Sequence, residues 1–447
     1  MARPGGGGCA GAAGGRRASG VPHRADRIRE RPRGDPLRRG RDVPPPSRAA
    51  GRAARADGVP ERRPPADRCA RRPRPDRGVG ARLGVTTVAV VGGGVTGLAA
   101  AWELQGTGAD VSVLESGRRA GGVIVTERRD GFVVEGGPDG FLAAEPDIQV
   151  LARELGIGDR LVDPLARGSL LWNGKELAPL AEGQAAALLG IEGQTGVDVS
   201  QGFRSFRGGM GDVVEALLAR LGSAVRTGMG VTAIAPSRRG YRLSLAGGSV
   251  VEAEGVVLAL PAWAAARLVA ALGVVAARCL EDVLYYPSVT VSLAYERNGL
   301  TGKLSGTGFV SAGESGTPVR ACTYASFKYP GRAPGGYALL RAFVAPLDGD
   351  PASVAHAELA KILGVTGAPL WSRAFHWTRG VPRYKPQHAQ HVARMRELLS
   401  LLPPLEIAGA GVDGAGVSAC VKSGRAAARR VLERMAGTNR SRQQAGD

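Results

Sequence analysis

Three glycine residues, Gly92, Gly94 and Gly97, follow a β-branched run at the spacing Gly-x-Gly-x-x-Gly and precede an apolar stretch typical of a helix. At this spacing the first glycine permits a tight turn, the second lets the backbone approach a pyrophosphate, and the third lets helix and strand pack closely. The helix N-terminus then presents N–H groups and a positive dipole to phosphate. An acid about 20 residues later binds the ribose hydroxyls in such sites, and Glu115 stands there. The pattern predicts a dinucleotide-binding site, with Gly93 as part of the turn.

A second glycine-rich segment begins shortly after the acid. Arg119 is followed by Gly121 and Gly122, and a basic residue next to a flexible glycine pair can surround a second phosphate. The arrangement Glu-x-x-x-Arg-x-Gly-Gly resembles that of the FAD-binding amine oxidase and desaturase superfamily. This resemblance implies FAD, rather than NAD, as the cofactor. It also implies that residues 135–141 (EGGPDGF) form a turn beside the flavin ring.

Further segments narrow the resemblance. They are residues 171–179 (LWNGKELAP), 206–210 (FRGGM), 380–388 (GVPRYKPQH) and 408–424 (AGAGVDGAGVSACVKSG). Together with the glycine turns they resemble the oxygen-dependent, FAD-containing protoporphyrinogen oxidases over about residues 85–435, with one gap. Coproporphyrinogen oxidases of the same fold share all of these motifs.

The resemblance implies that the chain oxidises protoporphyrinogen IX to protoporphyrin IX with O2, giving H2O2, late in haem biosynthesis. Oxidation of coproporphyrinogen III by the same chemistry is an alternative, as are an inactive FAD-binding homologue and another flavin amine oxidase. The expected partners are then a porphyrinogen substrate and O2. Because the cofactor carries the redox chemistry, we expect no catalytic side chain, and no Ser, His or Asp constellation stands out in the sequence.

Site residues follow from the resemblance, position by position. It assigns FAD contacts to Gly92, Gly93, Gly94, Gly97, Glu115, Arg119, Gly122, Gly137, Pro138, Val231, Ala410, Gly416 and Val417. Val231 would contact adenine through its backbone. The C-terminal glycine loop (residues 409–416) precedes an expected helix, so its N–H groups can face the flavin carbonyl where reduction develops negative charge. The resemblance implies a non-covalent cofactor, and we expect Cys420 to be a small buried thiol.

The substrate side of the site departs from the family. Arg167 precedes a strand expected near Leu170 and could hold a propionate, although a solvated surface arginine is an equal alternative. Residues 180–203 stand where the family has a long helical region that shapes substrate and membrane contact. We therefore expect a substrate domain of reduced size. Gln387 and Ala419 replace the Gly and Asp usual in the family.

The elements that position these residues alternate between strand and helix, which predicts an α/β fold. Strands are predicted at Thr87–Val91 and Asp110–Leu114 around a helix at 98–104, and a last helix from near Ser423 to about Gly437. The expected architecture is a Rossmann-like FAD-binding domain, of the two-dinucleotide-binding-domain flavoprotein type, with a second α+β substrate domain. Its expected parts are FAD-binding segments at 85–142, 206–284 and 391–437, a truncated substrate and membrane-binding insertion at 143–205, substrate-domain strands at 285–390, and tails at 1–84 and 438–447.

Most of the net charge of +19 lies in the N-terminal tail. Residues 1–84 hold 22 arginines, no lysine and 8 acids, a net charge of +14, which leaves only +5 for the other 363 residues. An Arg/Pro/Gly-rich segment of this kind cannot bury enough apolar surface to offset chain entropy, so we expect it to be disordered. It is a nucleic-acid-binding arm, a transit peptide, or translated sequence upstream of a start near Val85. We favour the last, and expect no nucleic-acid partner.

Composition and spacing exclude several other classes. The cysteines are scattered and odd in number, and the pair His388 and His391 lacks a third ligand, so no disulfide framework or metal site is expected. Residues 255–280 form the longest apolar stretch, but arginines interrupt it, and it is typical of a buried strand followed by an amphipathic helix. We expect a cytoplasmic location, with peripheral contact at the cytoplasmic face of the membrane and a homodimer as further options.

Overall fold

The computed structural model describes residues 86–180, 184–188, 201–302 and 304–444. All of them belong to the unit Val79–Asp447. The expected tail at 1–84 lies outside the described residues, as does much of the short stretch at 180–203.

A parallel five-stranded sheet forms the centre of the dinucleotide-binding part. Its order is β10 (Val225–Arg226), β2 (Asp110–Leu114), β1 (Thr87–Val91), β14 (Gly255–Leu258) and β22 (Leu405–Ile407). The apolar run of β1 is buried on both sides of the sheet, as a parallel strand requires. Val88 and Val90 enter one hydrophobic core, and Ala89 and Val91 enter another.

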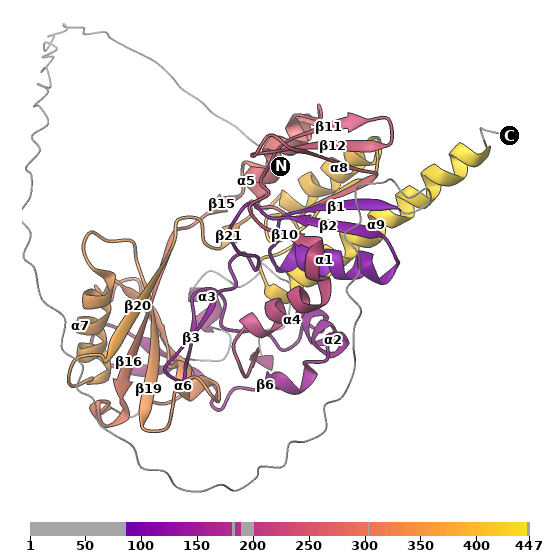
Figure 1. Cartoon of the computed structure of the whole chain (residues 1–447). Helices are drawn as coiled ribbons and strands as arrows, with labels where there is room; N and C mark the ends of the chain where they lie inside the picture. The colour runs from indigo at the N-terminus through magenta and orange to yellow at the C-terminus, as the bar shows by residue number, and fades with distance from the viewer. Residues whose placement is uncertain (1–85, 181–183, 189–200, 303, 445–447) are drawn as a thin grey trace, which may run out of the picture. The chain divides into compact units, whose positions relative to one another are not determined.

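Helices cover one face of this sheet, and helices and a small sheet cover the other. The first face carries α1 (Val95–Gly106), α2 (Asp147–Glu154), α4 (Gly211–Leu221) and α9 (Val417–Gln444). The second carries α5 (Ala262–Ala270), α8 (His388–Ser400) and the antiparallel sheet β11 (Val231–Ser237), β12 (Gly240–Leu245) and β13 (Val250–Ala253). The first helix, α1, lies along α9, so elements from the start and the end of the described chain are neighbours (Figure 1).

A seven-stranded sheet forms the second layered part. Its order is β20 (Trp371–Trp377), β16 (Ser288–Glu296), β19 (Tyr337–Val344), β18 (Val319–Thr323), β17 (Gly308–Ser311), β7 (Ser169–Trp172) and β8 (Leu177–Leu180). Alternate residues of β16 point to opposite faces. Val291 and Leu293 pack under α7 (Pro351–Leu363), whereas Ala294 packs against Phe132 and Val134.

The remaining elements are short. They are the hairpin β3 (Thr126–Arg129) and β4 (Phe132–Glu135); the sheet β5 (Phe141–Leu142), β9 (Phe203–Phe206) and β6 (Leu161–Val162); the pair β15 (Leu284–Tyr285) and β21 (Pro382–Arg383); the helices α3 (Gln184–Leu188) and α6 (Ala325–Lys328); and the 3-10 helices η1 (Gly158–Arg160), η3 (Gly222–Ala224), η4 (Val275–Leu280) and η5 (Arg297–Gly299).

The predicted α/β fold class is confirmed, and the first two strands have the predicted bounds. The prediction for the last helix was wrong at both ends: α9 begins at Val417 and continues to Gln444, through most of the segment expected to be a polar tail. The region 285–390 contains α7 as well as strands. The five-stranded sheet takes its strands from the segments 85–142, 206–284 and 391–437, and the seven-stranded sheet from 143–205 and 285–390. We propose the domain boundaries on that basis.

Candidate functional site

The first glycine turn (residues 92–97) has the backbone that its spacing predicts. Gly92 has a φ of +106°, and a Cβ there would overlap the carbonyl oxygen of Ala259. A Cβ on Gly97 would overlap the carbonyl oxygen of Gly92, so helix and strand pack at a distance only glycine allows. Gly94 differs, because the nearest heavy atom to its Cβ position, the Cα of Gly122, is 4.0 Å away. The N-terminus of α1 has no side-chain cap and opens on this space.

Glu115 lies half-buried at the end of β2 and reaches back to the first glycine turn. Its Oε2 accepts a hydrogen bond from the Gly93 N–H at 2.7 Å, and its Oε1 accepts one from the Gly117 N–H at 2.6 Å. The Glu115 carbonyl accepts from Met229 N–H at 2.7 Å, which brings the start of β11, at Val231, to the same end of the sheet. In a dinucleotide-binding site, an acid at this position binds the ribose hydroxyls. The start of β11 lies beside Glu115, where its backbone could contact the attached base.

Arg119 holds the second glycine turn (residues 121–122) against the first. Its guanidinium donates to the carbonyl of Gly122 at 2.6 Å and to that of Ile124 at 3.1 Å. The N–H of Gly121 donates to the Gly93 carbonyl at 2.7 Å, and a Cβ on Gly122 would lie 3.2 Å from the Cα of Gly94. Arg119 therefore holds the backbone of the second glycine turn in place. The sequence pattern had suggested that its guanidinium faces a phosphate, and spacing alone could not distinguish the two roles.

The third glycine turn (residues 136–140) continues the same surface. The N–H of Gly136 donates to the carbonyl of Val125 at 2.8 Å, and a Cβ on Gly137 would overlap the carbonyl oxygen of Val123. Gly137 thus lies against the segment that follows the second glycine turn.

The C-terminal glycine loop packs against the N-terminal turns. The Gly409 N–H donates to Ser423 Oγ at 2.8 Å, and the Cβ position of Gly409 is 3.3 Å from Thr96 Oγ1. Gly424 follows Ser423 in α9, and a Cβ on Gly424 would overlap the carbonyl oxygen of Thr96. Two segments that are more than 300 residues apart in sequence therefore pack against each other.

A buried carboxylate without a partner lies at the start of α9. Oxygen Oε2 of Glu145 has no hydrogen-bond partner among the described residues, and the Cβ position of Gly416 is 3.3 Å from it. Burial, with the nearby charge of Asp147, raises the pKa of Glu145. Gly416 and Val417 mark the N-terminus of α9. The carboxyl group of Glu145 and the backbone N–H groups of this helix end therefore lie near each other, with no hydrogen bond between Glu145 Oε2 and the helix.

Aromatic side chains support both ends of the site. The hydroxyl of Tyr384 donates to the Ala410 carbonyl, and the Nε1–H of Trp377 donates to the Gly136 carbonyl at 2.8 Å. The Ala262 N–H donates to the hydroxyl of Tyr285 at 3.0 Å. Trp377 and Tyr384 are thus hydrogen-bonded to two different glycine segments.

Sequence reasoning missed Thr96, Glu145 and Tyr285. Thr96 lies inside the first glycine turn and could have been proposed from its position there. Glu145 and Tyr285 carry no local signal, since their neighbours at the site come from distant segments.

Cys420 is buried in α9, 7% exposed. Burial raises the pKa of its thiol to about 11, so the thiolate that a covalent bond to a cofactor would require is scarce at neutral pH.

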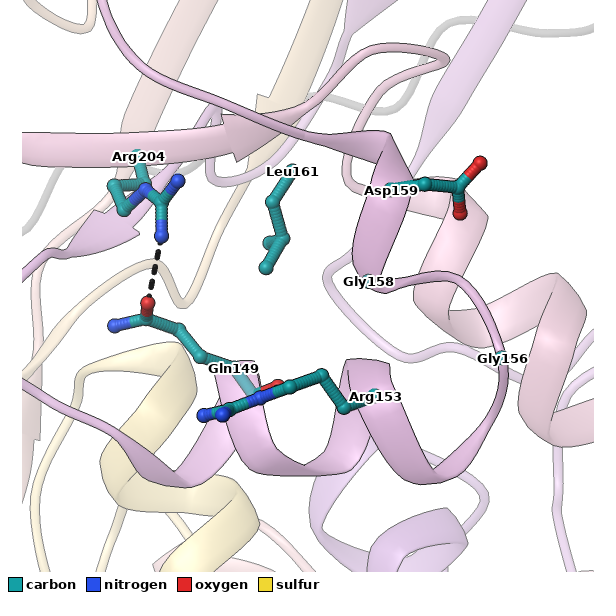
Figure 2. Close-up of a pocket in the computed structure, with 7 residues that line it drawn as sticks. All are labelled: Gln149, Arg153, Gly156, Gly158, Asp159, Leu161 and Arg204. Carbon is teal, nitrogen blue, oxygen red and sulfur yellow. Dashed lines mark hydrogen bonds between the residues drawn. The ribbon is translucent and has the colours of Figure 1, made fainter.

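Arg167 does not join this group. It is exposed, and its side chain has no polar partner in the described part of the chain. A separate open pocket, shown in Figure 2, is lined by Gln149, Arg153, Gly156, Gly158, Asp159, Leu161 and Arg204. Arg204 donates to Gln149 at 2.8 Å and pairs with Asp163 at 2.7 Å, so its charge is already neutralised. The pocket shares no residue with the glycine turns.

The site's polar groups fit a dinucleotide of the flavin type. An uncapped helix N-terminus suits a pyrophosphate, and glycines without room for a side chain permit close approach. The buried Oε2 of Glu145, which has no hydrogen-bond partner among the described residues, can interact with a polar group of a bound cofactor. Over the residues that the structure describes, no cluster of three or more His, Cys, Asp or Glu side chains could hold a metal ion. Over the same residues, no helix combines the length and apolar character needed to cross a bilayer.

Comparison with known proteins gives a family. The family described as flavin containing amine oxidoreductase matches residues 95–190 and 184–432. The coproporphyrinogen III oxidase of Propionibacterium freudenreichii subsp. freudenreichii is 27% identical, over 77% of this chain and 90% of that protein. The alignment is 481 positions long, more than the whole of this chain, so the relative contains segments without a counterpart here. The chloroplastic protoporphyrinogen oxidase of Nicotiana tabacum is 23% identical, over 74% of this chain and 83% of that protein.

Solved structures agree on the fold. A protein of Exiguobacterium sp. 255-15, provisionally named protoporphyrinogen oxidase, superposes with a TM-score of 0.67 at 24% identity, over 78% of this chain and 99% of that one. The cyclohexylamine oxidase of Brevibacterium oxydans IH-35A superposes with a TM-score of 0.63 at 16% identity, over 78% of this chain and 99% of that one. With its glycine segments joined in one site and its family match over most of its length, the chain belongs to the flavin containing amine oxidoreductases and is an FAD-dependent oxidoreductase.

Proposed function

We propose that the chain is a porphyrinogen oxidase of haem biosynthesis, which uses O2 and gives H2O2. The relatives' names support a porphyrinogen as the substrate. The bacterial relative named coproporphyrinogen III oxidase is 27% identical and the plant protoporphyrinogen oxidase 23%. We therefore place coproporphyrinogen III ahead of protoporphyrinogen IX, the reverse of the order that the sequence motifs suggested.

The observation that carries the flavin part of the proposal is the contact between the two ends of the described chain. Gly424 lies against the carbonyl of Thr96, and Gly409 lies against the Thr96 side chain. A single dinucleotide could then be bound by the first glycine turn at one end and by the C-terminal glycine loop at the other. A glycine-rich turn alone would suit many nucleotides, whereas this pairing supports an extended flavin cofactor.

We propose that FAD is bound non-covalently by the residues assigned above. They are Gly92, Gly93, Gly94, Gly97, Glu115, Arg119, Gly122, Gly137, Pro138, Val231, Ala410, Gly416 and Val417. When bound, FAD supplies the hydride acceptor and passes the electrons on to O2. The chain's own part is to orient the substrate, and the N-terminus of α9 offers a positive dipole where reduction adds negative charge. Glu145, with its raised pKa, is a further group that can share a proton at that end.

On the substrate side, we propose that Arg167 contacts a propionate group of the porphyrinogen. Arg167 is exposed and without a polar partner among the described residues, which leaves it available to a propionate. The Propionibacterium relative has segments that this chain lacks, which supports a substrate domain of reduced size. Contact with the cytoplasmic membrane face, a homodimer and a cytoplasmic location stay predictions.

A fluorescence assay tests the proposed function. The purified holoprotein is incubated in air with coproporphyrinogen III or with protoporphyrinogen IX, and porphyrin fluorescence and H2O2 are followed together. We expect both products to rise above autoxidation, with coproporphyrinogen III oxidised faster. The matched control is the same protein stripped of FAD, whose activity should return when FAD is added.

Each other outcome has a meaning. A protein that binds FAD but oxidises neither porphyrinogen above autoxidation would be an inactive homologue, and the proposal would be wrong. Faster oxidation of protoporphyrinogen IX would restore the order suggested by the motifs. Oxidation of an amine such as cyclohexylamine, without porphyrin formation, would move the chain to another branch of the family.

A further inference from the structure

Hydrogen bonds turn the carbonyls of the third glycine turn toward the protein interior. The Gly136 carbonyl accepts from Thr290 Oγ1 at 3.3 Å, from Arg341 at 3.3 Å and from Trp377 Nε1 at 2.8 Å. The Gly137 carbonyl accepts a further hydrogen bond from the same nitrogen of Arg341. A carbonyl has two lone pairs, so three donors on one oxygen saturate it and fix the direction of the peptide.

The seven-stranded sheet places these donors on one face. Ser292 of β16 is paired with Arg341 of β19, and Ser288 of β16 is paired with Trp377 of β20. Residues 288, 290 and 292 share a face because side chains alternate along a strand. Thr290, Arg341 and Trp377 therefore lie on a diagonal across three adjacent strands, directly against the turn.

The Arg341 guanidinium has no carboxylate of its own. It is 4% exposed, yet no ion pair within 4 Å joins it to any acid among the described residues. Two acids lie nearby, and each has another cation: Glu135 lies 3.8 Å from Arg332, and Asp139 lies 3.1 Å from Lys328. With three cations against two acids, this buried cluster carries an excess positive charge.

The nearby titratable groups support this charge count. Burial raises the pKa of Asp139, but the charges of Lys328 and Arg341 outweigh it, so its pKa lies below its usual range and it is ionised. Burial raises the pKa of Glu135, which favours its neutral form and would leave the cluster more positive still. Burial also lowers the pKa of Arg341, but a guanidinium stays charged at any pH a folded protein tolerates.

We propose that Arg341 is a positioning residue of the flavin site. It fixes the third glycine turn, which packs on the second glycine turn through Gly137 and Val123, and it holds a positive charge behind that turn. Reduction of a flavin adds negative charge, and a buried cation acts on it with little screening by salt. Arg341 therefore favours both binding of FAD and its reduced state. The inference rests on the family's cofactor and holds whichever substrate is oxidised.

Substitutions at Arg341 separate its two effects. R341M removes both the charge and the hydrogen bonds, whereas R341K keeps the charge but lacks the planar guanidinium that reaches both carbonyls. The matched control is W377F, which removes one neutral donor to the same carbonyl. The measurements are hydrogen exchange of residues 136–140 in the apoprotein, the Kd for FAD by flavin fluorescence, and the flavin midpoint potential by reduction alongside a dye.

We expect R341M to raise exchange in the turn, to weaken FAD binding by about tenfold or more, as the loss of partners to buried acceptors does, and to lower the midpoint potential. R341K should raise exchange and weaken binding but keep a potential near that of the unchanged protein. W377F should loosen the turn without moving the potential.

Two results would overturn the proposal. If R341M and W377F shift the potential equally, the charge has no role at the flavin. If neither R341M nor R341K raises exchange in the turn, Arg341 does not position it. Should R341M fail to fold, R341K decides the positioning claim by itself. Absence of porphyrinogen oxidation in the unchanged holoprotein would count against the proposed function alone, because exchange, Kd and potential of the variants test Arg341 without any substrate.

Discussion

At the scale of single residues, the site depends on glycines that no other residue can replace and on a carboxylate that lacks a partner. The glycines are required because a methyl group in their place would overlap a backbone carbonyl oxygen. The unpartnered carboxylate is that of Glu145, which lies next to the start of α9. Both features can be tested by changes of a few atoms.

We expect G97A to destabilise the fold, because the added Cβ would overlap the carbonyl oxygen of Gly92, a backbone atom that cannot move aside alone. Overpacking of this kind costs about 1–3 kcal/mol, measurable as a lower free energy of unfolding in urea. The matched control is G106A at the other end of the same helix, where a Cβ meets nothing within 4 Å. Equal effects of the two substitutions would show that the close contact at Gly97 is unimportant.

Glu145 should make the apoprotein less stable as pH rises. Burial raises its pKa in the folded state above the value of about 4.3 in an unfolded chain. At a pH between the unfolded and the folded pKa of Glu145, the folded state binds more protons than the unfolded state. The free energy of unfolding is therefore higher at low pH and falls as the pH rises through the folded pKa. We expect E145Q to show an increasing gain in melting temperature over the unchanged apoprotein from about pH 4 upward. Parallel melting curves for both proteins across that range would contradict this.

At the scale of elements, α9 links the dinucleotide-binding part together. Arg425 of α9 pairs with Glu103 of α1 at 2.7 Å and with Glu154 of α2 at 3.0 Å, and its side chain is only 15% exposed. Trp102 of α1 also donates to Glu154 at 3.0 Å. This network keeps α9 beside α1, and with it the C-terminal glycine loop beside the first glycine turn.

We expect R425M to lower the free energy of unfolding by about 1–3 kcal/mol, since hydrogen-bonded charges that lose a partly buried partner are costly. R429M is the matched control, because Arg429 pairs with the same Glu103 at 2.7 Å but is 56% exposed, and exposed pairs contribute about 0–1 kcal/mol. R425M should also weaken FAD binding if α9 positions the loop. Identical losses from both substitutions, in urea unfolding and in FAD titration, would speak against a special role for Arg425.

At the scale of the whole molecule, most of the positive charge and the proposed cofactor site belong to different segments of the sequence. The segment 1–84 carries a net charge of +14, whereas every glycine segment of the site lies between residues 92 and 424. The cofactor site should therefore not depend on the basic segment.

A variant that lacks residues 1–84 should keep the FAD stoichiometry, the flavin spectrum and the porphyrinogen turnover of the full chain. The measurement is the ratio of flavin to protein absorbance after gel filtration, together with the fluorescence assay. If the full chain binds DNA in a salt-sensitive way, that binding should disappear in the same variant, since it would come from the arginines. Loss of FAD on removal of the segment would show that it takes part in the site.

The sequence by itself determined the glycine turns, the acid at Glu115, the first strands and the identity of the superfamily. These depend on local rules: a turn that requires glycine, or a strand with two buried faces, can be recognised from a few neighbouring residues. The bounds of α9 were not predictable in the same way, because the helix packs against α1, β14 and β22, which come from distant parts of the sequence.

Only the tertiary structure decided the partners of the third glycine turn and of Glu145. Thr290, Arg341 and Trp377 come from three strands, and strand order and register place them on one face. Glu145 and Gly416 are 271 residues apart in sequence, yet they lie together. A buried group's partners and charge depend on which distant segments pack around it, and no local pattern records that information.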